Sequence, residues 1–180
     1  MSFAIDYIMH RVALNAASDT GHSESNLCLM AERAIKSGHT SQELYKRALQ
    51  QKERGKKADG LLHASYHDAL QSMVLYARVI TASGGAVTPS GKSNKTPSPY
   101  AVKTIISSLL KNCNWPSKKI DLDNIGDVAV QSGIELGFIP HSVVFAKRLS
   151  RYRIIRKWAE KWVKKRIMRY FDWYIDTRGL

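Results

Sequence analysis

The sequence predicts an all-α protein with an N-terminal helical bundle, a flexible loop, and a C-terminal helical region that ends in a long basic amphipathic helix. Apolar residues recur at steps of three and four over most of the 180 residues, which is the period of a helix that packs on one side. No run of alternating strand pattern appears, and at most residues 134–139 have the character of a short strand. A hydrophobic content of 44% with 24% charged residues is typical of a folded globular chain.

Residues 1–82 are expected to form the helical bundle, with helices over 2–17 and about 23–37 and a third that begins near Thr40. Gly38 stands where a left-handed C-terminal cap belongs, and Glu43 follows Thr40 at the spacing of a capping box. The polar residues 50–60 leave two alternatives open, a break at Gly55 or Gly60 or a single helix with a weak middle. A helical pattern resumes over 61–82.

Residues 83–99 change composition, because Gly, Ser, Thr and Pro dominate and lysine supplies all the charge. Such a segment is typical of a linker or a long loop, so it marks the best domain boundary. The triplet at 91–93 matches the end of a phosphate-binding P-loop, but Ala86 stands where that motif needs a glycine. A flexible basic linker is therefore favoured over a nucleotide-binding loop.

Residues 100–180 form the third predicted region. A helix should follow Pro99, and a short helix should cover 125–132. Gly133 and Gly137 would bracket a turn, after which a helix beginning at Pro140 should run into the basic tail. This order matches a helix-turn-helix in two alignments, with either Gly133 or Gly137 as the turn glycine, but an ordinary helical corner is the favoured interpretation.

The two cysteines, Cys28 and Cys113, lie far apart and form no CxxC pair, so the ligand count excludes a zinc finger. Two free thiols in a reducing compartment are the simpler expectation. The N-terminus lacks the basic start and continuous apolar centre of a signal peptide, and no apolar run is long enough to span a membrane. We expect a cytoplasmic protein, or one inside a virus particle if the source is viral.

Catalytic motifs are weak in this chain. His63 and His67 have the four-residue spacing that places two imidazoles on one helix face, but no third and fourth ligand is evident. Asp121, Asp123 and Asp127 alternate as metal-binding acids can, although capping the next helix is their simpler role. We therefore expect a protein that is not an enzyme and has no metal or cofactor, with a metal-dependent nuclease as the enzymatic alternative.

Charge is concentrated in the last forty residues, which hold twelve of the 28 Lys and Arg residues. Three acids oppose them, so this segment supplies +9 of the formal net charge of +13. Three of the four tryptophans are also here. A chain with a pI near 9.9 and clustered cations is expected to meet polyanions, either nucleic acid or an anionic membrane.

On a helical wheel the tail has a narrow apolar stripe opposite a cationic side. The predicted stripe consists of Phe145, Leu149, Tyr152, Ala159, Val163, Ile167, Tyr170 and Tyr174. Trp158 and Trp162 are placed on the flank between the stripe and the cations. Such a helix can dock on its own protein and present cations to nucleic acid, lie on a membrane, or bind a protein groove or its own copy.

We predict a non-enzymatic nucleic-acid-binding protein, with DNA or RNA held mainly through phosphates. The predicted contact residues are Lys147, Arg148, Arg151, Arg153, Lys157, Trp158, Lys161, Trp162, Lys164, Lys165 and Arg169. The alternative is a structural or assembly protein whose C-terminal helix mediates protein–protein contact or homo-oligomer formation. Binding to a membrane surface is the less favoured partner, because the bundle and linker suit a soluble assembly.

Overall fold

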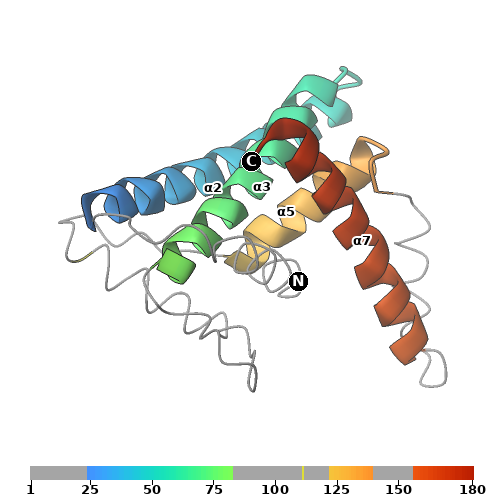
Figure 1. Ribbon diagram of the computed structural model, residues 1–180. Coiled ribbons are helices and arrows are strands. Elements are labelled where there is room, and N and C mark those ends of the chain that lie inside the picture. Colours follow the sequence, from blue (N-terminus) through green and yellow to red (C-terminus); the bar gives the residue numbers. More distant parts are fainter. Residues whose placement is uncertain (1–23, 83–110, 112–121, 140–155) are drawn as a thin grey trace.

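Four helices make up the part of the chain that the computed structural model describes, residues 24–82, 111, 122–139 and 156–180 (Figure 1). They are α2 (Glu24–Glu53), α3 (Asp59–Ala82), α5 (Leu122–Glu135) and α7 (Arg156–Arg178). No strand occurs within these ranges, so the predicted all-α class is confirmed. The predicted helix at 2–17, the loop at 83–99, and residues 140–155 of the predicted tail helix lie outside the described residues.

Helices α2 and α3 form an antiparallel hairpin (Figure 1). The chain reverses at Gly55, whose φ of 68° lies in the left-handed region that glycine adopts without steric cost. The amide of Lys56 donates to the Gln51 carbonyl at 2.9 Å and closes the end of α2. Of the two alternatives for residues 50–60, the break at Gly55 is confirmed, whereas Gly60 lies inside α3.

Gly38 does not end a helix, because α2 continues through it to Glu53. The predicted C-terminal cap is wrong, and so is the capping box at Thr40, which lies in mid-helix. Gly38 is instead a point of close helix approach. A Cβ there would lie 2.6 Å from Cδ1 of Ile125 on α5 and 3.0 Å from Oγ of Ser72 on α3. Tertiary packing overrides the local cap signals at this position.

Buried serines line the seam between α2, α3 and α5. The Ser65 hydroxyl donates to the Ser41 carbonyl at 2.9 Å and lies 3.2 Å from the Ser132 hydroxyl. Ser72 donates to the Ala34 carbonyl at 2.7 Å. Serine is small enough for the helices to pack closely. Each buried hydroxyl also has a hydrogen-bond partner, which compensates for its removal from water.

Helix α5 is longer than predicted and includes Gly133, so the alignment that makes Gly133 a turn is wrong. A Cβ on Gly133 would lie 2.8 Å from Cδ1 of Ile139 and 3.0 Å from the ring of Tyr66, and the glycine therefore serves close packing. The turn is made by Gly137, with a φ of 74°. The amide of Ile139 donates back to the Gly133 carbonyl at 2.9 Å, which folds residues 136–139 against the end of the helix.

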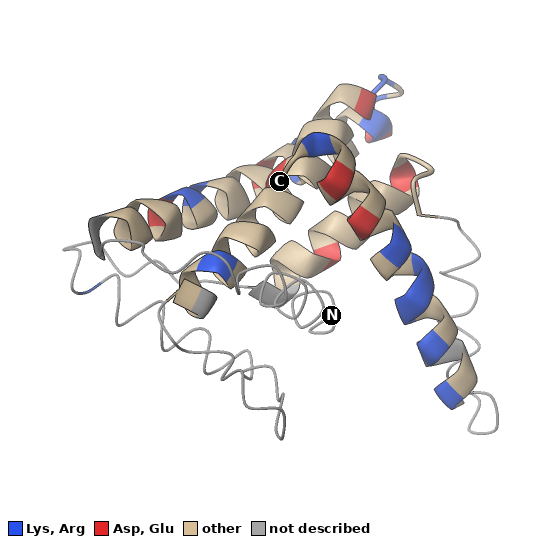
Figure 2. Ribbon diagram, viewed as in Figure 1, with Lys and Arg blue, Asp and Glu red and all other residues tan. Residues whose placement is uncertain are grey.

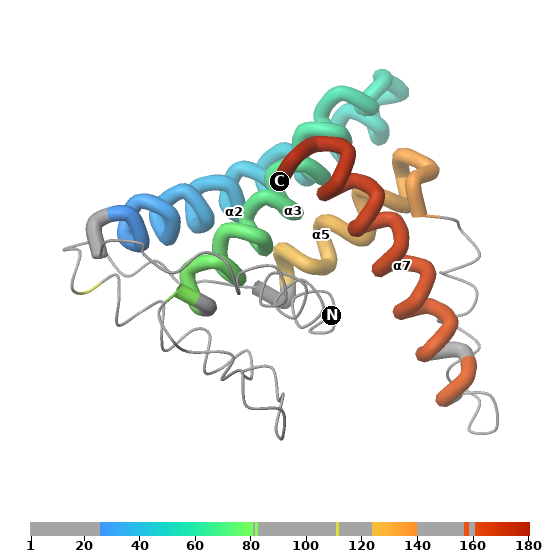
Figure 3. The backbone as a smooth tube through the Cα atoms, in the orientation of Figure 1, coloured from blue at the N-terminus to red at the C-terminus, as the bar shows by residue number. Residues whose placement is uncertain are grey.

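One hydrophobic core joins all four helices. Figure 3 traces the backbone of these helices along the chain. The largest fully buried side chains of this core are Tyr66, Tyr76, Phe171, Leu70, Met73, Ile80 and Ile139, whereas Leu62 belongs to a smaller cluster with Ala48 and Ala58. An ion pair between Lys52 and Glu135 also links the C-terminal ends of α2 and α5. The core thus draws on residues from both sides of 83–99. The division into 1–82, 83–99 and 100–180 stays a prediction.

Cys28 on α2 is held in a disulfide. The free-thiol prediction is therefore wrong for Cys28, and the inference of a reducing compartment loses this support. Cys113, the other cysteine of the sequence, lies outside the described residues.

None of the four described helices is long and apolar enough to cross a membrane.

Candidate nucleic-acid interface

Helix α7 carries the candidate site, and its two halves differ in their surroundings. Its C-terminal end lies over the α2–α3 hairpin, while its N-terminal end extends away from that hairpin (Figure 1). Lys and Arg residues follow one another along the extending half, whereas the docked half carries two acids and a basic residue, Arg178, in its last turn (Figure 2). The helix is therefore anchored at one end and presents its basic half outward.

The buried side of α7 consists of Val163, Ile167, Phe171, Tyr174 and Ile175. Val163, Ile167 and Tyr174 belong to the predicted stripe, but Tyr170 is only half-buried and Phe171 was not predicted. Residues four apart drift around a straight helix, because four residues turn it by slightly more than one revolution. A helix that crosses its neighbours at an angle buries such an inclined row, and a stripe drawn parallel to the axis misses part of it.

An aromatic cluster anchors α7. Tyr66 of α3 meets Tyr174 edge to face with ring centroids 4.7 Å apart, and meets Phe171 at 6.3 Å. Phe138, from the turn after α5, lies 5.7 Å from Trp173 and 6.1 Å from Tyr174. Edge-to-face and tilted pairs at these distances add to the energy of burial. Nothing in the sequence around Phe138 marked it as a partner of the tail.

The two histidines considered as metal ligands pack against these rings. His63 meets Phe138 edge to face at 5.2 Å, and Nδ1 of His67 lies 3.5 Å from the Tyr174 hydroxyl. Within the described ranges, no group of three His, Cys, Asp or Glu side chains is placed to hold a metal ion. The imidazoles thus contribute to the anchor of α7, and a metal site on this pair finds no further ligand among the described residues.

Burial sets the protonation of the polar groups in the anchor. Desolvation raises the pKa of the Tyr66 hydroxyl well above its usual value, and the nearby Tyr174 raises it further. Burial also raises the pKa of Tyr174, against the effect of the Arg178 guanidinium, which lowers it. Burial raises the pKa of the Asp68 carboxyl, and His67 opposes that shift. Both phenols are therefore neutral at physiological pH.

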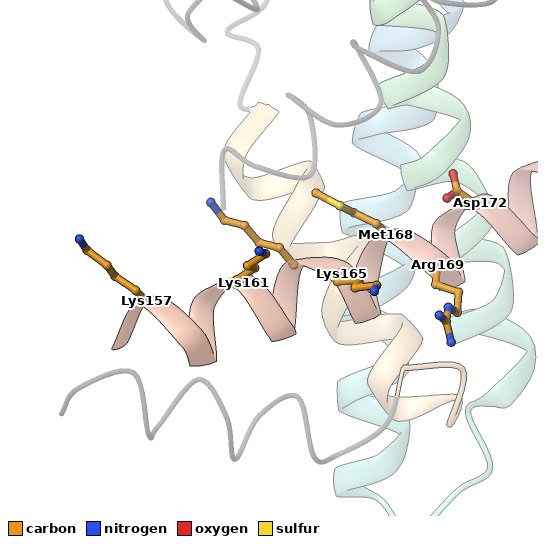
Figure 4. Close-up of a pocket in the computed structure, with 7 residues that line it drawn as sticks. Lys157, Lys161, Lys165, Met168, Arg169 and Asp172 are labelled. Carbon is orange, nitrogen blue, oxygen red and sulfur yellow. The ribbon is translucent and has the colours of Figure 1, made fainter. Parts of the chain in front are cut away.

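Beside and opposite the buried row lies the cationic face, which we define as Lys157, Lys161, Lys164, Lys165 and Arg169. All five side chains are exposed. With Met168 and Asp172 they line a groove of about 740 Å³ (Figure 4). The cationic face ends at Asp172, where the acids of the docked half begin. Lys147, Arg148, Arg151 and Arg153 of the predicted set lie outside the described residues.

The three tryptophans of the tail have different environments. Trp158 is 64% exposed, and Trp173 is 51% exposed with its edge against Phe138. Trp162 is half-buried against the core, and the Arg166 guanidinium lies over its ring at 5.3 Å. The sequence placed Trp158 and Trp162 together on one flank, but of these two only Trp158 is largely exposed.

Comparison of the chain with protein-family models, with curated proteins and with solved structures gives no match. Any function therefore rests on the chain's own residues. The helix that would follow the Gly137 turn in a helix-turn-helix begins outside the described residues, so that motif stays a prediction.

Proposed function

We propose that this chain is a non-enzymatic nucleic-acid-binding protein whose cationic face contacts phosphates. The observation that carries the proposal is the division of α7 into two sides. Lys161, Lys165 and Arg169 are exposed on one side, with Lys157 and Lys164 exposed at its border, while the opposite side is buried in the core. Within the described part of the chain, no ion pair is recorded for Lys157, Lys161, Lys165 or Arg169.

The dimensions of the face suit a polynucleotide backbone. A helix rises 1.5 Å per residue, so the twelve steps from Lys157 to Arg169 cover about 18 Å. One strand of a B-form duplex places a phosphate about every 3.4 Å along its axis, so this length corresponds to roughly five phosphates. The net charge of +13 adds a long-range attraction that raises the rate of encounter with a polyanion.

Burial of the apolar side favours nucleic acid over the two other partners. A membrane-surface helix inserts its apolar face into the lipid, and a groove-binding helix inserts that face into its partner. The apolar side of α7 is already in contact with the chain's own core, through Ile167, Phe171 and Tyr174. The surface left for a partner is cationic, and it complements phosphate.

Replacing lysines at two matched sets of positions tests the proposal. The first variant is Lys157→Gln, Lys161→Gln and Lys165→Gln. The control is Lys36→Gln, Lys46→Gln and Lys57→Gln, which removes the same charge from exposed positions outside α7. Both are titrated with salt against DNA and RNA, by fluorescence anisotropy on the full chain.

We expect the α7 variant to reduce the slope of log K against log salt by about 2 on single strands and nearly 3 on duplex, because each lost phosphate contact removes 0.7 to 0.9. The control should keep the slope of the unaltered chain. Equal losses in the two variants would show that net charge alone drives binding, and that outcome refutes the assignment to the cationic face. Absence of binding by the unaltered chain at low salt refutes the proposed function itself.

A further inference from the structure

We infer that the cationic face takes a single-stranded polynucleotide and that the Trp158 indole stacks on one of its bases. The inference rests on the proposed function and deepens it by naming the class of nucleic acid. It is carried by the position and exposure of one ring. Trp158 is 64% exposed on a helix whose opposite side is buried.

Helical spacing places Trp158 among the cations. Lys161 and Lys165 follow it by three and seven residues, so all three side chains lie on the same side of α7. Lys161 and Lys165 line the groove shown in Figure 4. A base stacked on the indole would therefore leave its own phosphate, and the phosphates on either side, within the field of the lysines.

The other tail tryptophans are engaged within the chain. The Trp162 ring is covered by Arg166, and Trp173 lies against Phe138 and 6.2 Å from Tyr174. No ring contact or cation–π contact is recorded for Trp158 among the described residues. The Trp158 indole is thus the tail tryptophan whose ring is most open to a ligand that stacks on it.

A single strand offers what this ring can use. In a duplex each base is stacked between its neighbours, and a protein reaches only base edges and the backbone. In a single strand the faces of the bases are open, and stacking on an aromatic side chain beside a basic groove is the usual mode of binding. The combination of one open indole and a row of cations therefore favours a single strand over a duplex.

The test uses the full-length chain with Trp158→Ala, Trp158→Phe and, as a control on the same helix, Trp173→Ala. The probes are a deoxythymidylate oligomer, an adenylate RNA oligomer and a DNA duplex of equal length. We expect Trp158→Ala to weaken binding of the single strands roughly tenfold, because stacking of one base accounts for a factor of about 5 to 150. Duplex binding and the salt slope should not change, since the phosphate contacts remain. Trp158→Phe should restore most of the loss.

Quenching of tryptophan fluorescence by the oligomer gives a second readout, and it should fall in Trp158→Phe but persist in Trp173→Ala. Loss of single-strand and duplex binding by the same factor in Trp158→Ala, or no loss at all, overturns the inference. If the Trp158 test fails in either way but single strands still bind with the expected salt slope, the proposed function stands and only the inference of stacking on Trp158 is lost. Displacement of the oligomer by polyglutamate at equal charge concentration would instead assign the surface to an acidic protein, and it would overturn both.

Discussion

The ring of Tyr66 on α3 meets the ring of Tyr174 on α7 edge to face, with their centroids 4.7 Å apart. The Tyr66 hydroxyl is buried and has no hydrogen-bond partner among the described residues, whereas the Tyr174 hydroxyl lies near His67. The contact joins the helix that carries the cations to the hairpin that carries most of the core. Because it lies at the docked end of α7, the orientation of the cationic face depends on it.

Replacing Tyr174 with Ala should release this anchor. Removal of a buried aromatic side chain costs about 3–5 kcal/mol, because a cavity remains where the ring was packed. We therefore expect the free energy of unfolding, measured with urea, to fall by about 3 kcal/mol, and amide protection along α7 to fall more than protection along α3.

Tyr174→Phe is the matched control, since it keeps the ring and removes only the hydroxyl near His67. It should cost no more than about 1 kcal/mol, the usual net contribution of one hydrogen bond. A Phe variant as unstable as the Ala variant would mean that the hydroxyl, and not the ring contact, holds α7.

Gly38→Ala should destabilise the protein although Ala is the better helix former. The new methyl would lie 2.6 Å from Cδ1 of Ile125, and relieving such overpacking costs about 1–3 kcal/mol. Because Ile125 is itself buried and has little room to move aside, we expect a cost in the upper part of this range, which exceeds the gain in helix propensity of about 1 kcal/mol. Thermal or urea unfolding should therefore show a net loss.

Gly60→Ala should instead stabilise the protein. Gly60 also lies in a helix, but nothing is within 4 Å of its would-be Cβ, so only the propensity gain of up to about 1 kcal/mol applies. Ile125→Val removes Cδ1 and should recover part of the loss in Gly38→Ala. If Gly38→Ala were as stable as Gly60→Ala, close approach would not explain Gly38.

Gly38 and Gly133 show how far the sequence predicts the fold. The helical period of the apolar residues was sufficient to predict the all-α class, the helix over 61–82 and the exposure of the cations of α7. The role of Gly38 and Gly133 could not be predicted, because a glycine that ends a helix and one that admits a neighbouring helix look alike in one sequence. The difference is set by Ile125 and Ile139, which lie far along the chain or beyond a turn.

The candidate site, too, could be predicted from the sequence only in part. Periodicity placed Lys157, Lys161 and Lys165 on one side, because exposure follows from the wheel alone. Periodicity could not predict that Trp158 is exposed and Trp162 half-buried, because the burial of Trp162 depends on Arg166 and on the core beneath α7. Phe171 was missed because the buried row is inclined to the helix axis, and that inclination is a property of the helix crossing.

Reduction should destabilise the chain, because Cys28 is in a disulfide. A disulfide limits the freedom of the unfolded chain and typically contributes about 2–4 kcal/mol. We expect a reducing agent to lower the urea midpoint of the unaltered protein and to leave Cys28→Ser unchanged. Titration of thiols in the non-reduced, denatured protein should find none. Two reactive thiols would contradict the disulfide and restore the prediction of free cysteines.

Asp68 should make stability depend on pH in an unusual direction for an acid. Burial raises its pKa in the folded protein above the ordinary value of 3.8, with His67 partly opposing the shift. The folded state therefore holds the proton more tightly than the unfolded state, and stability falls as pH rises from about that value through the raised pKa.

Asp68→Asn, which cannot ionise, should lose this component and be at least as stable as the unaltered chain at neutral pH. Asp127, an exposed acid on α5, gives the control variant Asp127→Asn, which should keep the pH dependence. Urea unfolding at a series of pH values measures both. A loss of stability in Asp68→Asn at neutral pH would show that the carboxylate is favourably paired there, which the direction of its pKa shift contradicts.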